Sequence, residues 1–175
     1  MVMPTANDLR ISSGGLVNDT VNHKFYIANP VYYGGTAVLF DTAHALDEDG
    51  NMWVKHASST DRPIGITLMS TVDANVPTRF VTASHFLSSV PVPVRRFIEG
   101  ELISVPLVGD HAQLAVGDKL GISASGEFDK FSSISGCVYS IAIVMDALAA
   151  GTGADGAAGY NAECVRCRVQ ITKEL

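Results

Sequence analysis

The sequence has few cysteines, a small share of charged residues and no long apolar run. No stretch approaches the roughly 20 apolar residues that a helix needs to cross a bilayer. Residues 1–8 contain neither a basic segment nor an apolar core, so we expect no secretory signal. Three cysteines, an odd count, in a chain without such a signal predict reduced and buried thiols.

Basic residues are also scarce, with 12 Lys and Arg against 18 Asp and Glu and a net charge of −6. They are dispersed, and the densest cluster is Arg95-Arg96. Nucleic acid binding needs clustered cations, so nucleic acid is disfavoured as the main partner. The 47% hydrophobic share argues against wholesale disorder, and 175 residues suffice for one domain with a core, with or without an added arm.

Motifs of catalysis and cofactor binding are missing. There is no Gly-x-Ser-x-Gly nucleophile elbow. Gly151-x-Gly153-x-x-Gly156 matches a dinucleotide fingerprint in letters, but the Gly and Ala residues that follow cannot form the helix which that motif requires. The five histidines, at positions 23, 44, 56, 85 and 111, lack metal-binding spacing. We therefore expect no catalytic residue and no cofactor.

Two groups of residues invite a metal assignment. Cys164 and Cys167 lie in an alternating run, and residues three apart on a strand point to opposite faces, so the pair cannot share a zinc ion. Asp41 and the acidic run 47–49 do not match the spacing of a calcium loop, so we interpret this segment as a solvated turn. We expect no metal site.

Short apolar runs separated by turn residues are abundant, with 16 Gly and seven Pro between them. The runs form two similar strand sets, at about 34–105 and 117–171. Each set has an apolar strand, a Gly turn, a small-residue strand and a Val-Arg strand, at 35–40, 48–51, 64–69 and 92–97 and at 117–122, 124–127, 139–144 and 164–169. Sets that each hide one face are expected to close on each other as a barrel.

The sequence thus predicts an all-β fold, a small closed or partly open barrel. Residues 1–15 form an extended N-terminal arm, and 16–175 form a single β-barrel domain. Residues 78–87 fit either a strand or a short helix, and the spacing of their apolar residues favours a helical insertion. Proline alternates with valine over 90–94, which predicts an edge strand or a bulge.

Residues 117–171 carry a resemblance to a known family. The matching parts are Gly117-Asp118-Lys119-Leu120, a turn with Gly126, the strand Ile141-Ala142-Ile143, an Ala/Gly loop, and the closing strand Val165-Arg166-Cys167-Arg168-Val169. This succession resembles the capsid cement, or head decoration, proteins of tailed viruses. The likeness is looser over 34–105 and excludes the arm and residues 70–90.

The resemblance implies a β-tulip-like barrel without enzymatic activity, bound to the outer surface of an icosahedral capsid that it stabilises. It implies a virion protein made in the host cytoplasm, commonly a homotrimer, with the major capsid protein and its own copies as partners. Neither nucleic acid nor a membrane is an expected partner.

Candidate partner contacts follow from position and composition. An extended arm can add a strand to the sheet edge of a neighbour, and a proline-marked edge near Val92 can offer another contact. The candidate capsid-binding residues are Val2, Met3, Pro4, Leu9, Arg10 and Ile11 of the arm, together with Arg95 and Arg96.

Two alternatives stay open. One is a tail or baseplate barrel of a virion, which ring stoichiometry would separate from a head protein. The other is a small barrel enzyme or ligand-binding protein that uses His44, His85 or His111. This second alternative requires two histidines and a carboxylate within hydrogen-bond reach.

Overall fold

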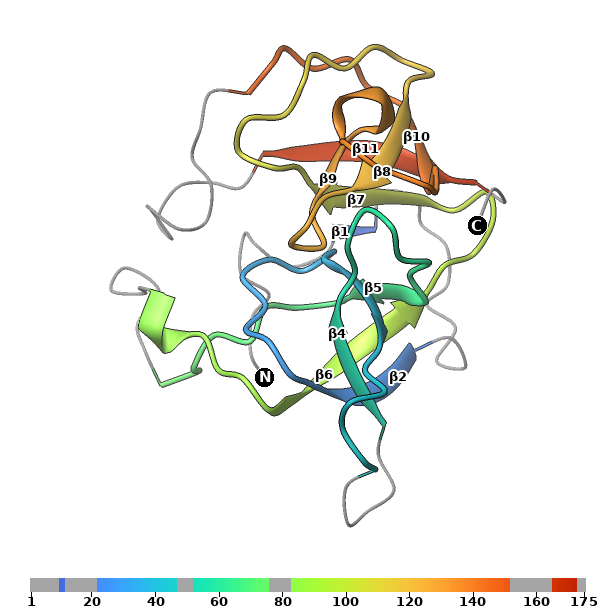
Figure 1. The fold of residues 1–175 in the computed structure, drawn as a ribbon. Coiled ribbons are helices and arrows are strands. Elements are labelled where there is room, and N and C mark those ends of the chain that lie inside the picture. Colours follow the sequence, from blue (N-terminus) through green and yellow to red (C-terminus); the bar gives the residue numbers. More distant parts are fainter. Residues whose placement is uncertain (1–9, 12–21, 47–51, 76–82, 152–164, 173–175) are drawn as a thin grey trace.

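The fold is known from a computed structural model that describes residues 10–11, 22–46, 52–75, 83–151 and 165–172 (Figure 1). The strands are β1 (Arg10–Ile11), β2 (Asn22–Ile27), β3 (Ala37–Phe40), β4 (Trp53–His56), β5 (Gly65–Thr67), β6 (Val90–Arg96), β7 (Leu102–Pro106), β8 (Lys119–Ile122), β9 (Phe128–Lys130), β10 (Ala142–Val144) and β11 (Arg166–Ile171). Two short 3₁₀ helices, η3 (Ala83–His85) and η4 (Phe131–Ser133), complete the described elements. The first of them lies in the region of the expected helical insertion, whose residues 76–82 fall outside the described part.

Strands β2 to β6 form a closed barrel in the order β2-β4-β3-β5-β6. The barrel closes between its first and last strands, which pair antiparallel from Asn22↔Arg95 to Ile27↔Val90. The predicted all-β class and small closed barrel are therefore confirmed. We call this unit the first barrel.

Strands β7 to β11, with β1 added at one edge, form a second sheet in the order β1-β7-β11-β10-β8-β9. Its two ends approach each other, because a parallel bridge joins Leu107 to Phe128 and the Val108 amide donates to the Phe128 carbonyl at 3.0 Å. We call this partly closed unit the second barrel. The arrangement differs from the expectation of one cylinder shared by both strand sets, since the chain forms two units. The boundaries also differ: β2 lies before the first predicted set, 34–105, and β7, which begins within that set, belongs to the second barrel.

The two barrels have the same strand pairing, residue for residue. The first strand of each pairs with the last, and the second strand pairs with both the third and the fourth. Equivalent pairs are Val38↔His56 and Leu120↔Lys130, Gly65↔Arg96 and Ala142↔Ile171, and Ile27↔Val54 and Leu107↔Phe128. The common register assigns every paired residue of one barrel a counterpart in the other.

The prolines of β6 belong to a strand that is paired on both sides in the closed barrel, and not to a free edge. The amides of Tyr26 and Ala28 donate to the carbonyls of Met52, just before β4, and Val54 of β4, at 3.1 and 3.0 Å. The alternate amides of β2 therefore face β6, opposite its valines. Pro91 and Pro93 consequently turn their nitrogens away from β2. On the other side, β5 pairs only with Val94–Arg96, so neither proline deprives the ladder of a donor. Val92 is buried, which excludes it as an edge contact.

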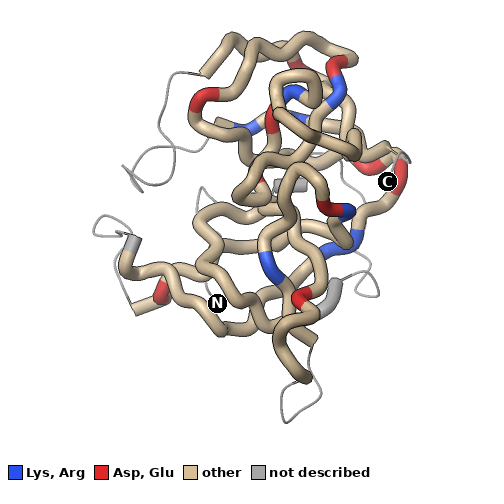
Figure 2. Tube along the Cα trace, viewed as in Figure 1, with Lys and Arg blue, Asp and Glu red and all other residues tan. Residues whose placement is uncertain are grey.

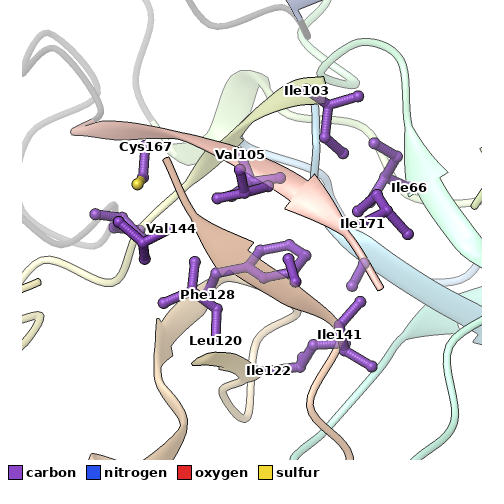
Figure 3. Packing of buried hydrophobic residues seen from close by; sticks show 14 of the residues in the cluster. Ile66, Ile103, Val105, Leu120, Ile122, Phe128, Ile141, Val144, Cys167 and Ile171 are labelled. Atoms are coloured by element: carbon purple, nitrogen blue, oxygen red, sulfur yellow. The ribbon is translucent and has the colours of Figure 1, made fainter. Parts of the chain in front are cut away.

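Two clusters of buried side chains hold the fold. The interior of the first barrel is filled by Phe25, Ile27, Val31, Val38, Val54, Val92 and Val94. The core of the second barrel surrounds Phe128 and extends across the junction, because Ala37, Ala57 and Ile66 of the first barrel belong to the same cluster. Figure 3 shows Ile66 reaching from β5 toward Ile171 and Ile103. One barrel thus packs its outer face on the core of the other.

The β8–β9 turn makes the polar part of this junction, reaching down to the first barrel in Figure 1. The Gly126 carbonyl accepts a hydrogen bond of 2.7 Å from the Ala37 amide, and the Val138 amide donates to the Ser59 carbonyl at 3.0 Å. Gly126 has a φ of 80°, and a Cβ atom there would lie 2.6 Å from the Ala37 oxygen. Only glycine allows this close approach.

Replacing Gly126 by alanine is expected to weaken the junction and lower the free energy of unfolding. Gly136→Ala is the matched control, because Gly136 also has a positive φ, 70°, but open space around its Cβ position. Both variants pay about 1–2 kcal/mol for a left-handed alanine, and only Gly126→Ala must also displace the Ala37 carbonyl. Urea unfolding should show a larger loss for Gly126→Ala, and equal losses would contradict the assigned contact.

Candidate functional site

The arm residues predicted to bind a partner lie partly outside the described chain, as Val2, Met3, Pro4 and Leu9 do. Arg10 and Ile11 form β1, which pairs antiparallel with β7 through Arg10↔Ser104 and Ile11↔Ile103. The arm therefore adds a strand to a sheet edge, as expected of it, but the edge belongs to its own chain.

Arg95 and Arg96, the densest basic pair, have different surroundings. Arg95 is 4% exposed, its Nε lies 3.2 Å from Glu101 Oε2, and its Nη2 forms an ion pair with Glu101 Oε1. Its guanidinium is therefore buried and ion-paired within the fold, although Nη1 has no hydrogen-bond partner among the described residues. This burial corrects the assignment of Arg95 as a partner contact. Arg96, the next residue on β6, is exposed. The sequence could not separate the two because the 90–96 run shows which residues alternate, but not which face is covered.

Arg166 and Arg168, two residues apart on β11, also have different partners. Arg166 donates from Nη2 to the carbonyls of Ser104 and Gly34, each at 2.8 Å, and so ties β11 to the first barrel. Arg168 forms a 2.8 Å ion pair with Asp146, and both side chains are about half exposed. An exposed pair of this kind contributes little to stability.

The cysteines do not form a metal site in the described structure. Cys167 is buried in the second core, and burial raises the pKa of its thiol to about 11. Cys164 lies outside the described residues. Across the described ranges, no three His, Cys, Asp or Glu side chains gather to hold a metal ion.

The three histidines considered for an enzyme or binding site have separate environments. His44 Nδ1 lies 2.7 Å from Asp41 Oδ2. His111 is buried and its Nδ1 lies 2.9 Å from the Ala112 carbonyl oxygen. His85 belongs to η3. Apolar side chains fill the interior of the first barrel. Of the arrangement that the enzyme or ligand-binding alternative requires, the described residues therefore retain the His44–Asp41 pair.

The His44–Asp41 pair lies at the end of the first barrel where β3 leaves and β4 enters. The His44 ring stacks on Trp53, with centroids 4.6 Å apart and planes at 18°, and Trp53 packs against Tyr26. Leu46 and Met52 flank this cluster and are 62% and 44% exposed. We call these described residues around the β3–β4 connection, Asp41, His44, Leu46, Met52 and Trp53, the hairpin face.

Asp41 is the electrostatic centre of the hairpin face and corrects the sequence interpretation of a solvated turn. Burial of its carboxylate raises its pKa. The hydrogen bonds from the Ala43 amide and from His44, with the charges of His44 and Lys55, outweigh that effect and lower the pKa below its ordinary value of 3.8. Residues 47–49, the rest of the acidic group, lie outside the described part. The sequence pointed to Asp41 only as one of a group of acidic residues. Its pairing with His44 could not be read from the sequence, because the stack that holds His44 joins the β3–β4 connection to Trp53 at the start of β4.

The charged residues are spread over both barrels in the described trace (Figure 2). In that trace, no helix has the length and apolar character required to cross a membrane. No protein-family model matches the chain, and no curated protein matches its sequence. The fold and the surfaces described above are therefore the basis for any functional proposal.

Removing the buried cation should cost far more stability than removing its exposed neighbour. Breaking a buried ion pair at one partner costs about 3–5 kcal/mol, whereas an exposed substitution changes stability by about 0.5 kcal/mol or less. We expect Arg95→Ala to lose several kcal/mol in urea unfolding and Arg96→Ala to stay near wild type. Equal effects would contradict the burial of the Arg95–Glu101 pair.

The lowered pKa of Asp41 predicts an acid-sensitive contribution to stability. The unfolded chain takes up the Asp41 proton first as pH falls, so the contribution is complete above the unfolded pKa, 3.8, and is lost as pH falls through the lower folded pKa. Between about pH 5 and about pH 3, the free energy of unfolding should fall more steeply for the wild type than for Asp41→Asn. If the free energies of unfolding of the wild type and Asp41→Asn fell in parallel over this pH range, the assigned His44–Asp41 interaction would be contradicted.

Proposed function

We propose that this chain is a non-enzymatic virion structural protein that binds the outer surface of an icosahedral capsid and stabilises it. Its partners are the major capsid protein and further copies of the chain, which associate as a homotrimer. The proposal rests on the resemblance of residues 117–171 to capsid cement proteins, and one observation about the fold carries it further.

That observation is the correspondence between the resembling segment and one structural unit. The Gly-Asp-x-Leu part covers the turn before β8 and its first two residues, and the Gly126 turn joins β8 to β9. The small-residue part contains the first two residues of β10, and the closing Val-Arg part contains most of β11. The resembling segment 117–171 therefore spans β8 to β11, all strands of the second barrel from its second to its last, which favours a scaffold of the cement-protein type.

The physical requirements of such a protein agree with the fold. A cement protein stabilises a shell because it binds the assembled lattice better than free subunits. Rigid contacts lower the entropy cost of that binding, and the two barrels share a core that holds them in one arrangement. Repeated weak contacts across symmetry-related sites then add through multivalency.

Microscopy of intact particles tests the location directly. We expect density of the two-barrel shape on the outer surface of the heads of the virus that encodes the chain, at positions of threefold symmetry. Density on the tail, or in sixfold rings, would contradict the proposal and favour the tail or baseplate alternative.

The arm provides a sharper test of attachment. Deleting residues 1–9 keeps β1 and its pairing with β7, so the fold should be retained, while co-sedimentation with purified heads should weaken because contacts of Val2, Met3, Pro4 and Leu9 are lost. Deleting residues 1–11 also removes β1 and exposes the β7 edge, so it reports the structural role of β1 separately. Unchanged co-sedimentation of the shorter deletion, with unchanged thermal unfolding, would exclude the arm as a capsid contact.

A further inference from the structure

His56, the last residue of β4, carries an enclosed nitrogen without a partner. Side chains alternate along a strand, so His56 points to the same side of β4 as Val54, which lies in the interior of the first barrel. Its cross-strand neighbour on β3 is Val38, another interior residue. Among the described residues, His56 Nε2 has no hydrogen-bond partner, and solvent does not reach it. The ring therefore lies at the end of an apolar interior.

A single hydrogen bond holds the His56 ring. Its partner is the backbone of Pro30, which can only accept. Since Nε2 has no partner, Nδ1 makes this bond, and the neutral ring has its hydrogen on Nδ1 and a lone pair on Nε2. Protonation adds an N–H at Nε2, where the described part of the chain offers no acceptor, and a charge beside apolar side chains. Both changes cost free energy.

The second barrel shows how the same position accommodates a cation. Lys130 is the counterpart of His56 in the common register, and its Nζ lies 2.7 Å from Asp118 Oδ2. Asp118 lies two residues before the β8 partner of Lys130, and Thr36 lies two residues before the β3 partner of His56. The Thr36 hydroxyl donates to the Tyr33 carbonyl at 2.7 Å. The first barrel thus keeps the position of the cation without the carboxylate.

The charged residues near His56 have other surroundings. Lys55 points to the opposite side of β4. Asp61 accepts two hydrogen bonds within its own loop, and Arg62 is exposed. On β2, His23 is six residues, about 20 Å, from the level of His56. The sequences of β3 and β5 contain no titratable residue. The remaining titratable residues on the neighbouring elements are Lys24, Tyr26, Tyr32, Tyr33, Arg95, Arg96 and Glu127.

Two causes act on the pKa of His56, and no charge is among them. Burial of the ring lowers the pKa below its ordinary value of 6.5, and the hydrogen bond to Pro30 raises it by less. As the pH falls through 6.5, the unfolded chain therefore binds this proton before the folded chain does. The stability that the neutral ring provides is complete above pH 6.5 and decreases below it.

The backbone that His56 holds belongs to the β2–β3 connection, residues 28–36, which also reaches the junction. Val31 of this connection fills the barrel interior. The Gly34 carbonyl accepts from Arg166 of β11 at 2.8 Å. In Figure 1, β4 ends on the side of the first barrel that is nearer the second. A His56 ring that leaves the interior therefore removes a support from the segment that contacts the second barrel.

We propose that His56 makes the β2–β3 connection acid-sensitive: the neutral ring holds the connection in place, and the protonated ring leaves the interior for solvent and loosens the contact between the barrels. Histidine is suited to this role because its charge changes near neutral pH. The device goes beyond the proposed function, since it belongs to the single chain. Its test contains no capsid, so the two proposals fail separately.

Urea unfolding of the full chain between pH 8 and pH 5 tests the proposal. His56→Gln keeps an N–H donor for Pro30 and cannot take up a proton. We expect the free energy of unfolding of the wild type to decrease below pH 6.5, and to decrease less for His56→Gln. His85→Gln is the matched control, because His85 belongs to η3 and not to the barrel interior. It should follow the wild type.

Hydrogen exchange, corrected for the intrinsic rate at each pH, locates the change. Between pH 7.5 and pH 5.5, the wild type should lose protection at the amides of Gly35 and Ala37, which are hydrogen-bonded at the end of the connection. The Val144 amide, bonded within the second barrel, should stay protected. His56→Gln should keep the protection of all three amides.

An NMR titration of the His56 ring in the wild type gives a reading that needs no variant. We expect the ring to take up its proton together with the loss of protection at Gly35. Three outcomes overturn the proposal: parallel stability curves for the wild type and His56→Gln, unchanged protection of Gly35 and Ala37, and protonation of His56 while these amides stay protected. Equal loss of protection in both barrels would indicate global unfolding and also overturn it.

Discussion

The contact on which the structure depends is the junction where the second barrel packs on the start of β3. The interior of the first barrel contains seven buried residues, and cores of this size rarely stabilise a fold alone. The outer residues Ala37, Ala57 and Ile66 join the larger cluster of the second barrel, so apolar surface that a separate barrel would expose is buried. The hydrogen bonds from Ala37 to Gly126 and from Arg166 to Gly34 fix the relative orientation of the two barrels at this packing contact.

The junction also explains why the chain contains two barrels of one register and not one larger cylinder. Each barrel pairs its first strand with its last. In the first barrel, this closure removes unpaired edges. The remaining apolar residues lie on the outer faces, where small side chains such as Ala37 and Gly126 allow close approach. The junction therefore buries outer apolar surface of the first barrel that its own closure would leave exposed.

The described residues offer exposed apolar side chains and no gathered polar site. The described histidines and cysteines are engaged in packing or in single contacts, such as His44 with Asp41. The exposed apolar features are instead Leu46 and Met52 of the hairpin face and Val116 before β8. Exposed apolar side chains of this kind are consistent with the proposed structural role in a larger assembly.

The sequence by itself determined the all-β class and the two successions of strands. It also determined the alternation that places Cys167 inside and Arg168 outside, because a strand has a side-chain period of two. It could not give the partner of each strand, the burial of Arg95 against Glu101, or the His44–Asp41–Trp53 cluster. Only the tertiary structure decided these, because periodicity specifies which side chains share a face, whereas strand closure and burial depend on contacts between residues far apart in the chain.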